Sequence, residues 1–219
     1  MLQANPNLRA QRMERVREAR LYAILDTGYS DPREWPQLAE EIIAGGAGIL
    51  QVRAKNESID DIRRWATPLL PRCRALGVPL IINDHVSLAA ELGADGCHIG
   101  QDDLSVLEAR AILRPDQLLG KSTHSLAQAY RTSKEDVDYI GYGPLFSTAT
   151  KPDYIPVGTR DIMKVQLEVG MPVFCIGGIN LTTLPHVVAA GARRIVVVSA
   201  LLQADSPREY AQKLLEVWA

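Results

Sequence analysis

The chain has few cysteines, and their spacing is not typical of disulfide bonds or of a structural metal site. Cys73, Cys97 and Cys175 are scattered along 219 residues, and no C-x-x-C pair occurs. An odd number of cysteines at these spacings argues against a disulfide framework and against a zinc site. It favours a reducing compartment. We therefore expect a cytoplasmic protein, and we expect the thiols of Cys97 and Cys175, which lie in apolar strands, to be buried and inert.

Long apolar runs and an excess of charge are also missing. No run reaches the roughly eighteen apolar residues that a membrane-spanning helix needs. Residues 1–20 are polar and rich in arginine, unlike a secretory signal. The formal net charge is −2, so no basic field indicates nucleic acid or an anionic membrane surface. Small molecules are the expected partners, with no nucleic acid and no membrane, and no particular oligomeric state is predicted.

What the chain does contain is a repeated junction in which a helix ends, glycine and alanine follow, and a hydrophobic strand begins. The junction occurs at residues 42–52, 89–98 and 187–198. Such junctions are typical of βα units around a parallel sheet. The expected strands are Leu21–Asp26, Gly48–Arg53, Val78–Ile82, Gly96–Ile99, Leu118–Ser122, Asp138–Gly141, Pro172–Ile176 and Arg194–Ser199.

Amphipathic stretches between these strands predict the helices of the same units. They are Pro32–Ala44, Ile59–Ala75, Val86–Leu92, Leu104–Leu113, Leu126–Lys134, Arg160–Val169, Leu181–Ala190 and Pro207–Val217, with one more helix at Leu8–Ala19. The expected N-caps include Asp31, Asp103 and Ser206.

Eight βα units in a chain of this length predict an α/β fold, a (β/α)8 TIM barrel with an extra N-terminal helix. We expect a helical extension at residues 1–20 and a single barrel domain at residues 21–219. A doubly wound open sheet is the alternative. It needs a G-x-G-x-x-G motif after an early strand, and none follows Leu21–Asp26.

Two carboxylates stand where a barrel builds its active site, at the carboxyl ends of the strands. Asp84 and Asp103 each follow a hydrophobic strand. Mg²⁺ is commonly held by one or two carboxylates together with substrate phosphates. Cations for such phosphates occur upstream at Arg53 and Lys55 and downstream at Lys151. These residues could be simple ion pairs and caps, but together they predict a magnesium-assisted diphosphate site.

A second sub-site is expected after the last two strands. Gly177-Gly178 before an expected helix, and Ser199-Ala200 after the final strand, could bind a phosphate through backbone N–H groups. His124 stands by the barrel mouth as a possible acid or base, whereas His98 is expected to be a hydrogen-bonded core residue.

From about Leu21 to Leu202, the chain resembles the thiamine-phosphate synthase family. The ordered motifs are QxRxK at residues 51–55, Asn83-Asp84, GADGxHxGQDD at residues 93–103, GxSTH at residues 120–124, GPxFxTxTK at residues 143–151 and IGGI at residues 176–179. The resemblance implies a (β/α)8 transferase with Mg²⁺ as cofactor. Its substrates would be hydroxymethylpyrimidine diphosphate and thiazole phosphate, and its products thiamine phosphate and diphosphate.

The resemblance also implies roles for individual residues. Asp84 and Asp103 would hold Mg²⁺ against the diphosphate. The diphosphate would be contacted by Arg53, Lys55, Asn83 and Lys151, with Gln51 lining its pocket and Ser122 bonding the leaving group. The thiazole phosphate would be bound by Thr148, Thr150, Gly178 and Ser199, and Val198 is also expected to contact substrate. Arg53, Ser122 and Lys151 are the expected catalytic residues.

The implied mechanism is dissociative: diphosphate leaves first, and the thiazole nitrogen captures the pyrimidine cation. Two other functions stay open on the sequence. A thiazole tautomerase on the same barrel would use His124 as an acid–base group and would need no metal pair. A non-catalytic protein could bind thiazole phosphate or thiamine phosphate without turnover.

Overall fold

The strands of the chain close into a parallel barrel. The computed structural model describes residues 6–148 and 155–219. Within them, eight strands pair in sequence order, and β8 pairs back onto β1. The strands are β1 Leu21–Asp26, β2 Ile49–Arg53, β3 Leu80–Asn83, β4 Gly96–Ile99, β5 Leu118–Thr123, β6 Tyr139–Tyr142, β7 Val173–Cys175 and β8 Ile195–Val197. The predicted (β/α)8 barrel is therefore confirmed.

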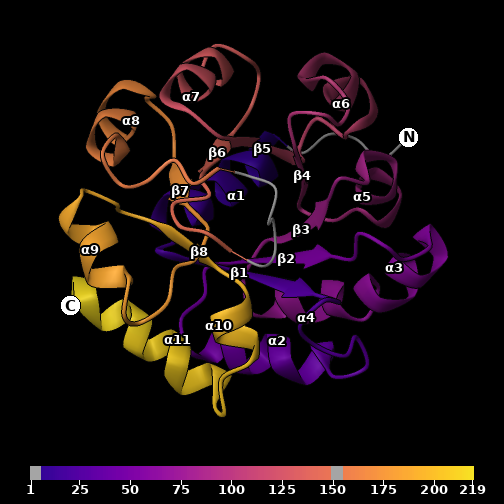
Figure 1. The fold of residues 1–219 in the computed structure, drawn as a ribbon. Coiled ribbons are helices and arrows are strands. Elements are labelled where there is room, and N and C mark those ends of the chain that lie inside the picture. The colour runs from indigo at the N-terminus through magenta and orange to yellow at the C-terminus, as the bar shows by residue number, and fades with distance from the viewer. Residues whose placement is uncertain (1–5, 149–154) are drawn as a thin grey trace.

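Helices surround the barrel, as Figure 1 shows. They are α1 Pro6–Glu18, α2 Trp35–Ala44, α3 Ile59–Ala66, α4 Leu69–Ala75, α5 Val86–Leu92, α6 Val106–Ile112, α7 Leu126–Thr132, α8 Ile162–Glu168, α9 Leu184–Ala189, α10 Ser199–Leu202 and α11 Pro207–Leu215, followed by the 3-10 turn η1 Glu216–Trp218. No helix in the described ranges is both long and apolar enough to cross a bilayer.

Alternating side chains divide the apolar residues into two layers. Residues such as Tyr139 point into the barrel, while neighbours such as Tyr142 pack outward against the helices. The inner layer contains three large aromatic rings, those of Tyr22, Tyr139 and Phe174. They pack edge to face, with ring centroids 5.4–5.9 Å apart. Gly120 makes room for them, since a Cβ at this position would lie 2.2 Å from the Tyr139 ring.

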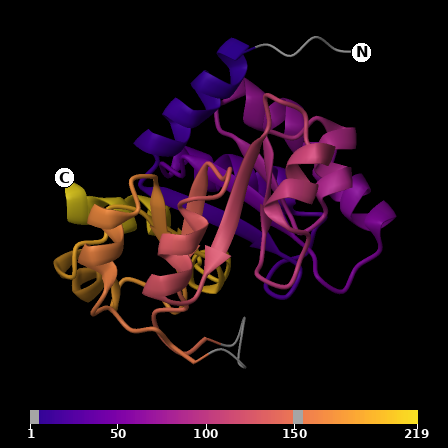
Figure 2. The same ribbon diagram turned by 90° about the horizontal axis from the view of Figure 1, so that it is seen from above.

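Helix α1 closes the amino-terminal end of the barrel. Val16 and Ala19 belong to the inner apolar layer, and Figure 2 shows α1 across the end of the barrel. Arg12 is buried, and its guanidinium bonds the carboxylates of Asp95 and Asp116, each at 2.7 Å. Asp95 also accepts a bond from the backbone N–H of Leu80 at the start of β3. This helix is therefore tied to the strands by charge as well as by apolar contact.

Several predicted element ends are wrong, for identifiable reasons. The expected helix at residues 59–75 is two helices, because Pro68 cannot continue the first one. Asp31 does not cap α2, which begins at Trp35 after Glu34. Ser105, and not Asp103, caps α6, and Glu108 completes a capping box. Ser206 caps α11 as predicted.

Candidate active site

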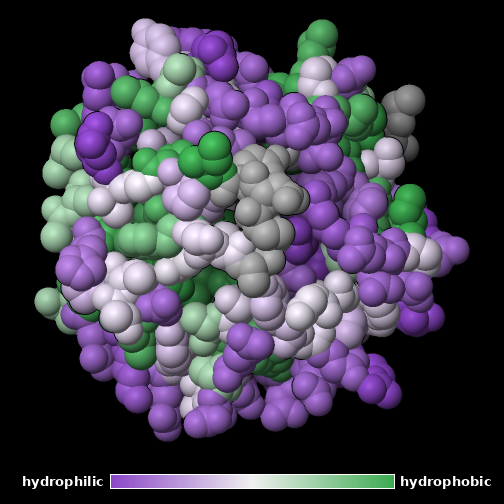
Figure 3. Space-filling model, in the orientation of Figure 1, coloured by the Kyte–Doolittle hydropathy of each residue, from purple (hydrophilic) through white to green (hydrophobic). Residues whose placement is uncertain are grey.

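A pocket lies at the carboxyl ends of the strands, and these ends face the viewer in Figure 1. Its floor is formed by Tyr22, Tyr139 and Phe174. Its lining includes predicted site residues from six strands or the loops after them: Gln51, Arg53, Asn83, Ser122, Thr148, Gly178, Val198 and Ser199. Hydrophilic residues dominate the right-hand part of this face in Figure 3. The pocket therefore combines an aromatic floor with polar lining residues such as Arg53 and Asn83.

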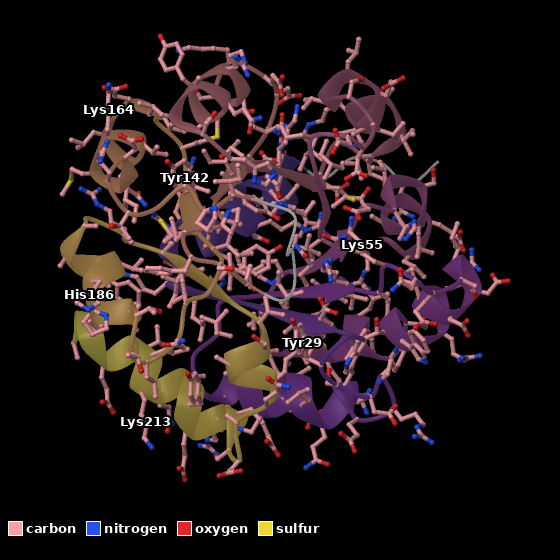
Figure 4. The ribbon with its side chains drawn as sticks, in the orientation of Figure 1. Tyr29, Lys55, Tyr142, Lys164, His186 and Lys213 are labelled. Atoms are coloured by element: carbon pink, nitrogen blue, oxygen red, sulfur yellow. The ribbon has the colours of Figure 1, made fainter. Side chains whose placement is uncertain are left out.

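Asp84 lies beside this pocket, near the like-charged Asp103 and the oppositely charged Lys55. The Lys55 Nζ is 3.2 Å from an Asp84 carboxylate oxygen, and Figure 4 shows Lys55 on the β2–β3 side of the mouth. Burial and the neighbouring carboxylate of Asp103 raise the pKa of Asp84, while Lys55 acts in the opposite direction. The net direction is upward because burial, the largest cause, and then Asp103 together outweigh Lys55.

The backbone holds Asp84 in a conformation that few side chains adopt. Its φ is 62°, in the left-handed region, and its N–H donates to the carbonyl of His98 at 2.8 Å. Asp103 has a backbone contact of its own, because the N–H of Gly100 donates to its carboxylate at 2.6 Å. In the described ranges no three His, Cys, Asp or Glu side chains are grouped to bind a metal ion. A cation between Asp84 and Asp103 would therefore need further ligands from a substrate.

Arg53 projects into the pocket from the end of β2, and a buried carboxylate fixes it there. Asp26, at the end of β1, is 3 % exposed. Its carboxylate accepts a hydrogen bond from Nη1 of Arg53 at 2.5 Å. Its other oxygen accepts from the backbone N–H of Gly28 at 2.8 Å. The sequence prediction did not include Asp26, although the register that sets it opposite Arg53 follows from two adjacent parallel strands.

Ser122 and two histidines lie on the β4–β6 side of the pocket. The Nε2 of His98 is 3.0 Å from Ser122 Oγ, and its Nδ1 is 3.4 Å from the hydroxyl of Tyr139. His98 is thus hydrogen-bonded, as predicted, but it also lines the pocket. His124 lines the pocket too, and its Nδ1 bonds the carbonyl of Gly143 at 2.5 Å.

The side of the pocket formed by β7 and β8 contains the residues predicted to bind the second phosphate. Gly178 has a φ of 68°, and a Cβ there would lie 2.7 Å from Phe146, so glycine is required. Gly177-Gly178 does not open the following helix, however, because α9 begins only at Leu184. Ser199 is the first residue of α10, directly after β8. Thr150 and Lys151 lie outside the described residues.

Comparison with known proteins assigns the chain to a family. A family profile described as thiamine monophosphate synthase matches residues 21–201. Thiamine-phosphate synthase from Chloroflexus aurantiacus is 40% identical over 196 residues, 89% of this chain and 90% of the relative. The enzyme of the same name from Halalkalibacterium halodurans is 40% identical over 191 residues, 87% of this chain and 90% of the relative.

A solved structure agrees with this assignment. Thiamine phosphate pyrophosphorylase from Pyrococcus furiosus superposes with a TM-score of 0.83 at 28% identity, covering 96% of this chain and 97% of that one. Sequence and fold thus point to one family over nearly the whole chain. The chain belongs to the thiamine monophosphate synthase family.

Proposed function

We propose that this chain is a transferase that joins hydroxymethylpyrimidine diphosphate to thiazole phosphate, yielding thiamine phosphate and diphosphate. Support comes from family membership and from one feature of the site. The paired carboxylates Asp84 and Asp103 lie at the same mouth as Lys55, beside a pocket lined by Arg53 and Ser122. Paired acids next to cations suit a diphosphate with a hard divalent cation better than they suit a neutral substrate.

Mg²⁺ fits the donor set of the two acids. The raised pKa of Asp84, caused by burial and then by Asp103, indicates a place where added positive charge is favourable. Asp84 and Asp103 would hold the ion, and phosphate oxygens would complete its coordination. When bound, Mg²⁺ would neutralise charge that develops on the departing diphosphate.

The residues of the chain then have separable roles. Arg53 and Lys55 bind the diphosphate, with Asn83 beside them, and Lys151 is proposed to join them. Ser122 donates a hydrogen bond to the leaving group, where negative charge grows in the transition state. Gln51 lines the diphosphate pocket, while Thr148, Thr150, Gly178, Val198 and Ser199 surround the thiazole phosphate.

The reaction itself needs no nucleophile from the protein. The carbon–oxygen bond to diphosphate breaks first, its electron pair leaves with the diphosphate, and the thiazole nitrogen then forms the new carbon–nitrogen bond. The barrel must align that nitrogen and exclude water, because water would capture the pyrimidine cation. The aromatic floor of Tyr22, Tyr139 and Phe174 suits the second task.

The decisive experiment mixes the purified protein with both substrates, with and without Mg²⁺, and measures thiamine phosphate and diphosphate. Equal amounts of both products, formed only with Mg²⁺, are expected. Binding of thiazole phosphate without either product would contradict the proposal and favour a binding protein. Isomerisation of a thiazole phosphate without Mg²⁺, abolished in His124→Ala, would favour a tautomerase instead.

A further inference from the structure

A chain of hydrogen bonds crosses the interior of the barrel and ends at Ser122. Gln51 Nε2 donates to the hydroxyl of Tyr22 at 2.6 Å, and this hydroxyl lies 3.0 Å from that of Tyr139. Tyr139 is 3.4 Å from His98 Nδ1, and His98 Nε2 is 3.0 Å from Ser122 Oγ. The five residues come from five strands, β2, β1, β6, β4 and β5.

The first three side chains of this hydrogen-bonded series are almost completely buried at the bottom of the pocket. Gln51 is 2 % exposed, Tyr22 1 % and Tyr139 0 %. Burial raises the pKa of both phenols above the ordinary tyrosine value, so each hydroxyl keeps its single hydrogen at neutral pH. Each phenol can therefore donate only one hydrogen bond. Once the direction of one hydrogen bond in the series is fixed, the direction of the next one is fixed too.

The amide of Gln51 sets that direction. An amide nitrogen only donates, so the Tyr22 oxygen accepts from Gln51 and its hydrogen must point elsewhere. Tyr139 is the only other hydrogen-bond partner of the Tyr22 hydroxyl within the described part of the chain, so Tyr22 donates to Tyr139. The opposite direction would leave a buried hydroxyl hydrogen without an acceptor, which is costly. Tyr139 must then donate onward, to His98 Nδ1.

We infer that Gln51, Tyr22 and Tyr139 are positioning residues that hold His98 as the tautomer protonated on Nε2. That nitrogen donates to Ser122 Oγ, so the hydroxyl hydrogen of Ser122 points into the pocket. Ser122 thereby presents a hydrogen-bond donor to the departing diphosphate at all times. No proton is transferred. The inference deepens the proposed function and rests on it only for the identity of the leaving group.

The tautomer can be measured in the free protein, without any substrate. Long-range proton–nitrogen NMR at about pH 8 distinguishes the two ring nitrogens of each neutral histidine. The His98 signals are identified by their absence in His98→Gln. His98 should carry its hydrogen on Nε2, and His124 should carry it on Nδ1, because that nitrogen faces the carbonyl of Gly143. A wild-type His98 protonated on Nδ1 would overturn the inference even if the enzyme is fully active.

Kinetics test the link to Ser122. Tyr139→Phe should lower kcat about tenfold with little change in KM, the size of one well-placed hydrogen bond. In a Ser122→Ala background the same change should alter kcat less than about twofold, because its route to the substrate is gone. Tyr142→Phe is the matched control, since Tyr142 lies on the same strand but packs outward.

The outcomes separate the two proposals. A tenfold loss from Tyr139→Phe in both backgrounds would mean that the phenol acts independently of Ser122, which contradicts the inference. If the wild-type protein makes no thiamine phosphate, the proposed function fails, and the NMR experiment still decides the His98 tautomer.

Discussion

At the scale of single residues, Asp26 controls where Arg53 can reach. The pair is enclosed, with side-chain exposures of 4% and 15%, so solvent screens it only weakly. A guanidinium held from behind by a carboxylate presents its remaining N–H groups in a fixed direction. Asp26 should therefore matter for diphosphate binding although it is not among the residues that line the pocket.

Asp26→Asn should show this role. We expect kcat/KM for the pyrimidine diphosphate to fall about tenfold and the free energy of unfolding to fall by about 2 kcal/mol, because a charge-assisted bond becomes a neutral one. Steady-state kinetics and urea unfolding would measure both. Asp31→Asn is the control. Its carboxylate pairs with Arg33, whose side chain is 86% exposed, and its loss should change stability by less than about 0.5 kcal/mol.

Asp84→Asn should separate activity from stability. Asparagine tolerates the left-handed φ of this position, so the backbone can stay in place. We expect Mg²⁺-dependent turnover to be lost. Asp205→Asn, an exposed acid outside the site, should keep full activity. Wild-type turnover in Asp84→Asn would contradict the metal assignment.

The same variant makes a prediction about pH. Because the folded protein raises the pKa of Asp84, it holds that proton more tightly than the unfolded chain does. This group therefore lowers the free energy of unfolding as pH rises above the ordinary aspartate pKa of about 4. Without metal, Asp84→Asn should be more stable than wild type near pH 8, with a smaller difference near pH 4. Urea unfolding in EDTA would measure this. A less stable variant near pH 8 would contradict the like-charge interpretation.

How far such residues could be predicted depends on the kind of information. Alternation along a strand tells which side chains face the barrel, so Gln51 and Arg53 could be expected at the pocket. It does not tell which side chains meet across the barrel. The contact of Tyr22 with Tyr139 spans 117 positions in the chain, and no local pattern encodes it. The pair Asp26–Arg53 is different, because it joins the ends of two adjacent strands and follows from their register.

At the scale of elements, helix α1 is joined to the barrel by a buried cation. Arg12→Met should lower the free energy of unfolding by about 3 kcal/mol, because Asp95 would remain buried without its partner. Thermal unfolding should then shift by roughly 6–12 °C. Arg15→Met is the control on the same helix. Its ion pair with Glu18 is exposed on both sides and should contribute less than about 0.5 kcal/mol. Equal effects of the two changes would contradict this role for Arg12.

Element types were easier to predict than element ends. Hydrophobic runs followed by amphipathic runs indicated each βα unit, and every unit is present. The ends depend on competition between neighbouring caps, and Ser105 forms a capping box that Asp103 cannot form. Asp103 is consequently left at the mouth with its carboxylate turned back to Gly100, where it can influence Asp84.

At the scale of the whole molecule, the closed barrel could be predicted by counting units, because eight βα repeats have few other arrangements. The boundary at residue 20 between a helical extension and the barrel domain remains a prediction. The inner apolar layer contains residues of α1 as well as residues of the strands, so the two parts share a core. We expect one cooperative thermal transition, with equal calorimetric and van't Hoff enthalpies. Two separate transitions, the first melting α1 alone, would instead indicate an independent N-terminal unit.

The position of α1 has a practical consequence for attaching the protein to a surface. The helix covers the amino-terminal end of the barrel, while the pocket opens at the other end (Figure 2). Lys164, His186 and Lys213, in contrast, lie on the outer helices around the barrel (Figure 4). A linker on the exposed side of α1, for example at Arg15 or Glu18, would orient immobilised molecules so that the opening of the pocket faces the solution. Random coupling through lysines would orient many of them sideways.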